Sequence, residues 1–333
     1  MSHTAPFMVC DEDPEVIADE WQELVDEADP ENIFLRPDWH HLWSHVFGNG
    51  QPARAKTVRD GERLLGLANV TEFDGVLTLA GDANVWDYAG MPLRPGFEQV
   101  ALDALIASFA DEHWKEVILW GLKEDSALLR ELPGVAKEHG FAVDQEVEAV
   151  CPEIALPDSW EDYLGSLNKK DRHELRRKMR RFGELEGHAE LLVLTEPDEV
   201  LAALPDFIRL HIASRTDKAE FMTTEMQHFF RHVAGDMALH HRIRLYLLRV
   251  GTEAVASLLC FDAVDSLLLY NSGYDPVYSH ASVGVVSKAL CLQDAIANGK
   301  RRFNFLRGDE RYKYDLGARD TMVYRCRLTR VDG

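Results

Sequence analysis

The order of predicted secondary-structure elements occurs twice along the chain, and this repeat restricts the fold more than any single motif. Turn pairs such as Asp60-Gly61 and Asp74-Gly75 separate three strand-like runs in the first half, which precede a helix and a further strand: 53–59, 64–73, 76–80, 97–110 and 116–120. The same order returns in the second half at 244–250, 254–261, 266–273, 283–298 and 303–306. We find no repeat at the level of residues. We therefore expect two copies of one fold.

This repeat predicts an α/β (α+β) protein with two tandem domains, each a mixed central sheet flanked by helices. A length of 333 residues exceeds the usual size of one hydrophobic core, which also favours two domains. We place the domains at 1–157 and 158–333. Further helices are expected at 13–28, 36–47, 126–139, 160–164, 169–185, 197–214 and 223–239, with a loop at 216–221.

Charge is distributed unequally between the halves. The net charge is −21, and residues 1–157 hold 10 Lys+Arg against 31 Asp+Glu, whereas the remainder holds 26 of each. All the surplus negative charge therefore lies in the first domain, for which we expect no donor site of its own. A phosphate-bearing ligand is expected in the second domain, because local positive potential attracts an anion whatever the total charge.

Cysteine usage and hydropathy indicate a soluble cytoplasmic protein. The five cysteines are scattered and lack metal-ligand spacing, so neither a disulfide framework nor a metal site is expected. The N-terminal sequence shows no signal peptide, and no apolar run is long enough to span a membrane.

Ionisable residues follow the predicted strand at 303–306 directly. The strand ends in Arg307-Gly308-Asp309-Glu310, and then in Tyr312-Lys313-Tyr314. Open α/β sheets usually bind ligands beyond the carboxyl ends of their strands, so these residues are candidates for a catalytic site. A strand, a glycine turn and a solvated charge cluster would also produce this pattern.

A helix start lies close to the end of another predicted strand. Ser282, Val283, Gly284, Val285 and Val286 begin an apolar helix whose first N–H groups and positive dipole end can bind a pyrophosphate without a lysine. Ser-x-Gly also occurs as ordinary helix capping. The nearby acidic and basic residues favour the binding interpretation.

Three other segments are candidates for substrate binding. Arg172 and Arg176 lie on a basic face of the helix at 169–185, which is too short a stripe in too acidic a protein for DNA; it fits an anionic substrate or a solvated face paired with the acidic half. His211 and Arg215 stand one helical turn apart, although a lone histidine is more often structural. Trp86, Asp87 and Tyr88 either line a cleft or pack beneath their own loop.

Four segments together carry a family resemblance: Phe-Asn-Phe-Leu-Arg-Gly-Asp-Glu-x-Tyr-Lys at 303–313, Gly-Tyr-Asp-Pro-x-x-Ser-x-x-Ser-Val-Gly at 273–284, the basic helix at 160–181 and Asn-Ile-Phe-Leu-Arg-Pro-Asp-Trp at 32–39. They resemble the cellulose-biosynthesis-type acetyltransferases of the GNAT superfamily, relatives of the Fem peptidoglycan aminoacyltransferases. The resemblance spans nearly the whole chain and implies tandem GNAT-like domains.

The resemblance also implies acyl transfer to an amine or hydroxyl, with acetyl-CoA or another acyl-CoA as donor at Ser282 to Val286. Asp309 or Glu310 would be the base, Tyr312 the acid for the leaving thiolate, and Lys313 or backbone N–H groups the oxyanion donors. Tyr274 joins the candidates for substrate binding. The acceptor is expected to be a small molecule or a cell-envelope precursor. A Fem-like transferase using aminoacyl-tRNA, which the acidic half disfavours, and a non-catalytic binding protein are the alternatives.

Overall fold

The computed structural model describes residues 7–48, 53–112, 114–185 and 187–331. The chain forms two compact units, each with its own sheet. The first unit comprises the residues up to Val150 together with those from Thr321 onward, and the second comprises Cys151–Asp320. The N-terminal segment on which the expected absence of a signal peptide rests lies largely outside the described residues.

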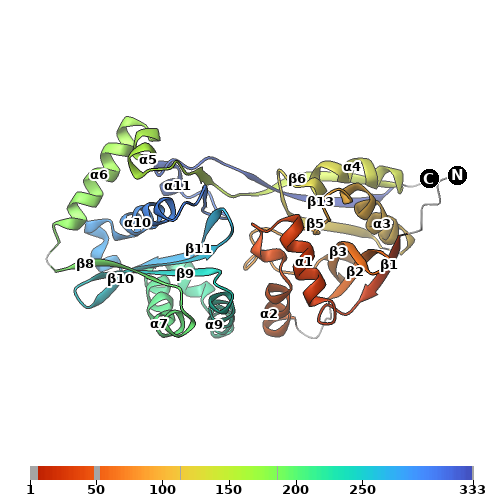
Figure 1. Ribbon diagram of the computed structural model, residues 1–333, viewed down its shortest axis with the longest axis horizontal. Coiled ribbons are helices and arrows are strands. Elements are labelled where there is room, and N and C mark those ends of the chain that lie inside the picture. Colours follow the sequence, from red (N-terminus) through yellow and green to blue (C-terminus); the bar gives the residue numbers. More distant parts are fainter. Residues whose placement is uncertain (1–6, 49–52, 113, 186, 332–333) are drawn as a thin grey trace. The chain divides into compact units, whose positions relative to one another are not determined.

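In the first unit, the described residues form a seven-stranded sheet in the order β1-β2-β3-β4-β5-β13-β6. Its strands are β1 (Met8–Glu12), β2 (Arg54–Asp60), β3 (Arg63–Phe73), β4 (Val76–Leu79), β5 (Glu116–Lys123), β6 (Phe141–Val150) and β13 (Met322–Arg330). Its helical segments are α1 (Ala18–Ala28), η1 (Ile33–Leu35), α2 (Pro37–Phe47), α3 (Glu98–Asp111) and α4 (Ala127–Glu138). Helices α1 and α2 lie on one side of this sheet and α3 and α4 on the other (Figure 1).

In the second unit, a six-stranded sheet of the described residues has the order β7-β12-β11-β10-β9-β8. Its strands are β7 (Glu153–Ala155), β8 (Ala189–Leu194), β9 (Ile243–Val250), β10 (Glu253–Asp262), β11 (Ser266–Tyr274) and β12 (Arg302–Asn304). Its helical segments are α5 (Trp160–Ser166), α6 (Lys169–Gly183), α7 (Pro197–Ser214), α8 (Thr216–Phe221), α9 (Thr224–Leu239), η2 (Pro276–Ala281), α10 (Val283–Ala297) and α11 (Arg311–Asp315). Helices α7 and α9 cover one face of the sheet and α10 covers the opposite face (Figure 1).

The expected repeat is confirmed by strand pairing as well as by element order. In both units a three-stranded antiparallel meander pairs its last strand in parallel with the strand that follows a helix: β4 with β5, and β11 with β12. Each parallel pair spans only three residue pairs, for example Ser266↔Arg302 to Leu268↔Asn304. The rest of β11 therefore continues beyond the end of its parallel neighbour.

The unit boundaries differ from the expected 1–157 and 158–333. The last strand, β13, lies between β5 and β6 of the first sheet, where Val323, Cys326 and Leu328 are fully buried. Conversely, β7 pairs with β12 in the second sheet. The cause is strand pairing between residues nearly 200 positions apart, for example Met322 with Val150 and Val323 with Lys123, which local sequence patterns do not encode.

Several element boundaries also differ from the expected ones. The expected helix at 13–28 begins only at Ala18, and a short strand, β1, precedes it. Residues 216–221, expected as a loop, form the helix α8. None of the helices in the described ranges has the length and apolar character that a membrane crossing requires.

Candidate active site

The segment after β12 turns away from the sheet within a few residues. The side-chain oxygen of Asn304 accepts a hydrogen bond from the Leu306 N–H at 2.8 Å, and Leu306 has a left-handed φ of 56°. Gly308 has a φ of 115°, a conformation that side chains with a Cβ rarely adopt. This turn leads into α11, whose Tyr312 ring lies 4.9 Å from the ammonium of Lys288 in α10.

Lys313 holds this turn in place. Its side chain is 2% exposed, and its ammonium donates to the carbonyl oxygens of Leu306, Arg307 and Gly308 at 3.1, 3.0 and 2.9 Å. It also lies 3.0 Å from the carboxylate of Glu310. All three ammonium protons therefore have acceptors within the turn. This geometry contradicts the expectation that Lys313 supplies a donor to an oxyanion, because it acts as the anchor of the loop.

The other predicted catalytic residues occupy different environments. The Glu310 side chain is 43% exposed. Burial raises its pKa, but the charges of Lys313 and Arg215 outweigh this and leave the pKa lowered, so Glu310 is ionised at neutral pH. Burial raises the pKa of Tyr312 well above its ordinary value, so its phenol stays protonated. Asp309 is exposed. The structure thus brings Glu310, Tyr312 and Lys313 together.

Two further lysines, which the sequence patterns did not single out, stand near this group. Lys288 of α10 is 6% exposed, donates to the Gly284 carbonyl oxygen at 3.0 Å, and lies 4.9 Å from the centre of the Tyr312 ring. Lys218 of α8 donates to the carbonyl oxygen of Ser272 in β11. Burial, with the charge of Lys218, lowers the pKa of Lys288 to about 7; burial, with the charge of Arg215, lowers that of Lys218 to about 8.

These groups form what we call the cation cluster: Arg215, Lys218, Lys288 and Lys313 around the carboxylate of Glu310. Arg215 and Lys313 shift the pKa values of Lys218 and Glu310 through their charges, and Lys218 and Glu310 shift that of Lys288. The cluster carries more positive than negative charge in partly buried surroundings, so it can stabilise an anion or a developing oxyanion. One sequence signal for Lys288 existed: it is the sole basic residue of the apolar helix α10.

His211 is a structural neighbour of this cluster. Its side chain is 1% exposed, and Nε2 lies 3.0 Å from the side-chain oxygen of Asn271 in β11. Burial and the charge of Lys218 lower its pKa to about 4, so the imidazole is neutral at physiological pH. A Cβ on Gly273 would collide with the backbone of His211, which shows how closely α7 packs on β11. Arg215 pairs with Asp217 just after α7.

The start of α10 retains free donors for an anion. Ser282 has a left-handed φ of 58° and precedes the helix. The N–H groups of Val285 and Val286 donate to the Ser282 carbonyl oxygen at 2.9 and 3.0 Å, whereas those of Val283 and Gly284 have no recorded acceptor within the described residues. The Val283 and Val286 side chains are buried in the core, so only the backbone groups of these two residues can contact a bound anion.

Tyr274 packs its ring against Gly284. A Cβ on Gly284 would lie 3.0 Å from an atom of this ring, so the absence of a side chain permits the contact. A cavity of about 270 Å³ lies beside the same helix start, between α6, α10 and α11. It is lined by Lys170, Asp171, Glu174, Leu175, Lys178, Val285, Arg311, Asp315 and Leu316. Val285, one of the predicted donor-binding residues, thus lines this cavity.

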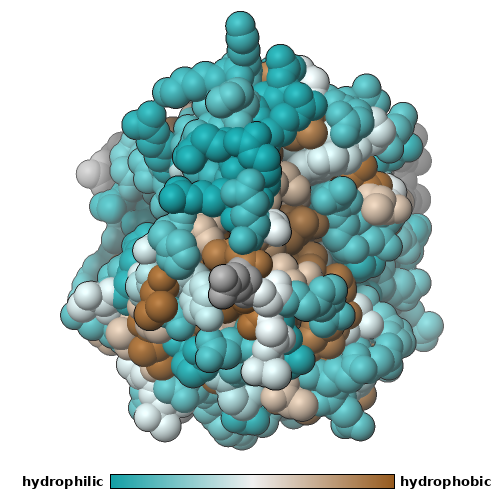
Figure 2. Space-filling view, turned by 90° about the vertical axis from the view of Figure 1, so that its left-hand side faces the viewer, coloured by the Kyte–Doolittle hydropathy of each residue, from teal (hydrophilic) through white to brown (hydrophobic). Residues whose placement is uncertain are grey.

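The basic helix α6 is largely solvated. Arg176 is 57% exposed and lies 3.5 Å from Glu161, while Arg172 donates to the carbonyl oxygens of Leu164 and Gly165 at 3.5 and 3.3 Å. Hydrophilic residues cover the upper part of the second unit's outer face, where α5 and α6 lie in Figure 1 (Figure 2). Within the second unit, basic residues of α6 form ion pairs with Glu161, Glu174 and Glu184.

The aromatic loop of the first unit lies in the core. Trp86 is 1% exposed, donates from its indole nitrogen to the Phe34 carbonyl oxygen at 2.9 Å, and has ring contacts with Trp39, Trp43 and Trp120. Tyr88 is 5% exposed. The expectation that Trp86 and Tyr88 contact a substrate is therefore wrong for their rings, because they fill the interior of the unit. Asp87 between them is half-buried.

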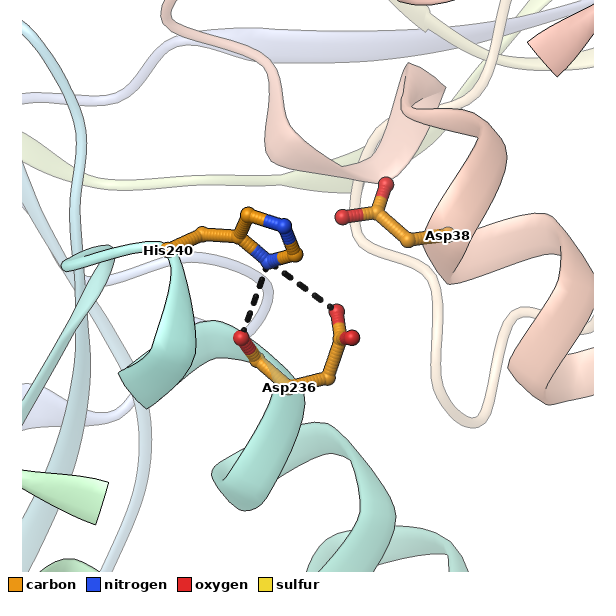
Figure 3. A group of neighbouring side chains, drawn as sticks. All are labelled: Asp38, Asp236 and His240. Atoms are coloured by element: carbon orange, nitrogen blue, oxygen red, sulfur yellow. Dashed lines mark hydrogen bonds and ion pairs between the residues drawn. The ribbon is translucent and has the colours of Figure 1, made fainter. Parts of the chain in front are cut away.

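His240 follows the last residue of α9. Its Nδ1 lies 3.0 Å from the Asp236 carbonyl oxygen and 3.7 Å from the Asp236 carboxylate (Figure 3). Both contacts are local to one helix turn, and the same Asp236 carbonyl oxygen also accepts from the His240 N–H at 3.2 Å.

Comparisons with known proteins agree with this fold. Residues 169–314 match a family described as an acetyltransferase (GNAT) domain. FemX is similar over 96% of this chain and 96% of its own, with a TM-score of 0.67 and 10% identity. L-PGS from Bacillus licheniformis covers 95% of this chain and 92% of its own, with a TM-score of 0.58 and 13% identity. No curated protein sequence matches the chain.

A tandem GNAT protein from the clavulanic acid biosynthesis pathway is similar over 98% of this chain and 100% of its own, with a TM-score of 0.50 and 10% identity. At such identities these likenesses establish the fold alone. The matched family region runs from α6 to α11 and so includes α10, β12 and the cation cluster. Residues 169–314 thus match the family of GNAT acetyltransferase domains, and a tandem GNAT-like fold extends over nearly the whole chain.

Proposed function

We propose that the protein transfers an acyl group from acyl-CoA to an amine or hydroxyl of its acceptor, with acetyl-CoA as the first donor to test. The observation that carries this proposal is the position of the cation cluster. It lies where β11 continues beyond β12, with Lys288 donating to Gly284 in the first turn of α10. An anionic donor group on the helix start and a reacting carbonyl near Tyr312 would thus share one edge of the sheet.

The side chains suit the requirements of acyl transfer. Tyr312 keeps its proton at neutral pH and can deliver it to the leaving thiolate. Lys218 and Lys288 can stabilise the oxyanion of the tetrahedral intermediate, because both are partly desolvated and neither has all its donors recorded as bound. Glu310 is ionised and can accept the proton of the nucleophile, either directly or through water.

The ion pair with Lys313 affects how well Glu310 can act as a base. Its pairing with Lys313 lowers its pKa, which weakens it as a base while fixing its position at the loop. Lys288, whose pKa is about 7, is therefore the alternative base when it is neutral. We assign the base to Glu310 first, since its carboxylate is far more exposed than the Lys288 amine.

The test combines binding and turnover. Calorimetry with acetyl-CoA and CoA measures whether the donor binds. CoA release with a panel of amines and alcohols then identifies an acceptor. With that acceptor, Tyr312→Phe and Glu310→Gln are each expected to lower kcat by about a hundredfold, the ordinary scale of acid–base catalysis.

Tyr314→Phe is the matched control, because Tyr314 lies on the same short helix but donates to the exposed Asp320 at 2.7 Å. It should leave kcat unchanged. If Tyr312→Phe and Glu310→Gln turn over at the wild-type rate, the assignment of these residues is wrong. If acetyl-CoA and CoA do not bind at all, the donor assignment is wrong.

A second candidate is transfer from aminoacyl-tRNA. It is favoured by one observation, the likeness to FemX over 96% of both chains, which exceeds the likeness to the tandem GNAT protein in TM-score. The exposed basic face of α6 would contact the RNA backbone. Calorimetry with charged and uncharged tRNA separates the candidates, since binding to charged tRNA without binding to CoA supports this one. Binding to neither supports a non-catalytic role.

The proposal places donor binding in the second unit alone, with a small molecule or a cell-envelope precursor as acceptor. The excess negative charge of residues 1–157 supports this placement, because it disfavours an anionic donor there. The proposal also includes a cytoplasmic location. The five cysteines support it, since all lie as free thiols within the described residues.

A further inference from the structure

A polar cavity of about 250 Å³ lies in the first unit, outside every region given a role above. Its walls come from the end of α1, the segment 89–93, and the turn between β5 and α4. This volume suits a ligand smaller than a typical drug-sized molecule. Six lining residues offer hydrogen-bonding or charged groups and carry the inference: Asp29, Asn32, Lys123, Asp125, Ala127 and Leu128.

The start of α4 supplies two backbone donors to this cavity. Ser126 caps the helix, with its hydroxyl accepting from the Leu129 N–H at 3.2 Å and its carbonyl accepting from the Arg130 N–H at 3.3 Å. Within the described ranges, the N–H groups of Ala127 and Leu128 have no recorded acceptor. Free N–H groups at the positive end of a twelve-residue helix favour a negatively charged group.

Asn32 supplies an independent donor. It is 2% exposed and lines the cavity, and its side-chain oxygen accepts from the Phe34 N–H at 3.2 Å. That bond fixes the orientation of the amide, and none of the hydrogen bonds between described residues uses its Nδ2 group. Because Asn32 lines the cavity, this group is available to donate to a ligand there.

Charge decides which class of ligand fits. Lys123 lies 3.1 Å from Asp29 and 5.8 Å from the centre of the Tyr88 ring. Asp29 and Asp125 against Lys123 give the lining a net charge of −1, which disfavours a simple anion such as phosphate. The lining therefore pairs a group of hydrogen-bond donors with two carboxylates. A ligand that carries both an anionic and a cationic group satisfies both parts.

We propose that this cavity binds a free α-amino acid. The carboxylate of the ligand accepts from the Asn32 amide and from the N–H groups of Ala127 and Leu128. Its ammonium group lies against Asp29 and Asp125, where it shares the carboxylates with Lys123. The site involves no covalent step and is independent of the proposed acyl transfer, since each of its residues belongs to the first unit.

The experiment titrates the full-length protein with each proteinogenic L-amino acid by calorimetry. The tightest ligand is then compared with its N-acetyl derivative, which lacks the ammonium, and with its amide, which lacks the carboxylate. Each derivative is expected to bind at least about tenfold more weakly, because one charged hydrogen-bonding partner is lost. Absence of binding by all the amino acids overturns the proposal, as does a derivative that binds as tightly as the free amino acid.

Two substitutions locate the binding. Asn32→Asp keeps the oxygen that accepts from Phe34 but replaces the free donor with a negative oxygen, and Asp29→Asn removes one carboxylate at constant size. Each should weaken binding by about tenfold. Asn84→Asp is the control, because it makes the same change in an exposed turn, and it should leave affinity unchanged.

Circular dichroism checks that each variant folds. If Asn32→Asp fails to fold, Asp29→Asn and the two ligand derivatives still decide the question. Amino-acid binding that neither substitution weakens would overturn the assignment to this cavity.

Discussion

The two units share one strand arrangement but fill the equivalent place with opposite chemistry. In the first unit, Trp86 and Trp120 occupy the end of the β4–β5 pair, and the Trp120 indole donates to the Leu79 carbonyl oxygen at 3.0 Å. In the second unit, the end of the β11–β12 pair is bordered by Lys218, Lys288 and the Lys313-anchored turn. Aromatic rings fill one edge, and charged side chains border the other.

This difference shows how a duplicated fold can divide its tasks. Burying lysines costs free energy, and a sequence free of functional demands would replace them with apolar side chains. At the end of the β4–β5 pair the first unit has apolar side chains, whereas at the end of the β11–β12 pair the second unit has partly desolvated cations. The difference agrees with our proposal that only the second unit binds an anionic donor.

The largest effect on stability is expected from removing one of the buried aromatic rings of the first unit. Trp86→Ala removes a fully buried indole and its hydrogen bond to Phe34, and should lower the free energy of unfolding of the first unit by about 4 kcal/mol. Tryptophan fluorescence during urea unfolding measures this, because every tryptophan except Trp160 lies in the first unit. A loss below about 1 kcal/mol would mean that the rings do not hold this edge.

The next effect concerns the anchor of the charged edge. Lys313→Met leaves three carbonyl oxygens of the turn without their donor and removes the partner of Glu310, so the second unit should lose about 3 kcal/mol. Urea unfolding followed by circular dichroism measures the loss. Arg311→Gln, a change in a highly exposed side chain of the same helix, is the control. Equal stability of both variants would contradict the anchoring role.

A smaller effect, with a defined sign, is expected from pH. Burial and the charge of Lys218 lower the pKa of Lys288 from 10.5 to about 7, so between these values the unfolded chain binds more protons at this group than the folded protein does. The contribution of Lys288 to stability should therefore rise from about pH 7 to about pH 10. In Lys288→Met this part of the rise should be absent.

The exposed Lys115→Met is the control, since Lys115 is 67% exposed. It should keep the wild-type pH dependence. Urea midpoints at several pH values make the comparison. If Lys288→Met shows the same rise as wild type, the lysine is solvated and the charged edge is less buried than the structure indicates.

The sequence predicted the shared part of the two units better than the difference between them. Meander, helix and parallel strand follow from local alternation, turn pairs and capping residues, so their order could be read directly. The turn at 307–310 could be located because charges interrupt an apolar strand. The chemistry of this turn could not be predicted, because the three carbonyl acceptors of Lys313 come from a backbone conformation that depends on Leu306 and Gly308.

Other features depend on contacts between distant residues. The assignment of β13 to the first sheet rests on its pairing with β5 and β6. The low pKa of Lys288 rests on burial beneath Tyr312 and on Lys218, which belongs to a segment expected to be a loop. Trp86 was a reasonable candidate for a ligand contact, since aromatic residues in a loop without periodicity serve either purpose. Only the ring contacts with Trp39, Trp43 and Trp120 decide for the core.

The smallest effect on stability is expected from a substitution in α6, and this substitution also tests whether the helix binds an anionic ligand. Arg176 and Glu161 are 57% and 77% exposed and lie 3.5 Å apart, so Arg176→Gln should change the free energy of unfolding by less than about 0.5 kcal/mol. If the helix binds an anionic donor, the same variant lowers affinity for CoA or charged tRNA, and the loss diminishes at high salt. Unchanged affinity at low salt would show that α6 is a solvated face, and would confine anion binding to the cation cluster and the start of α10.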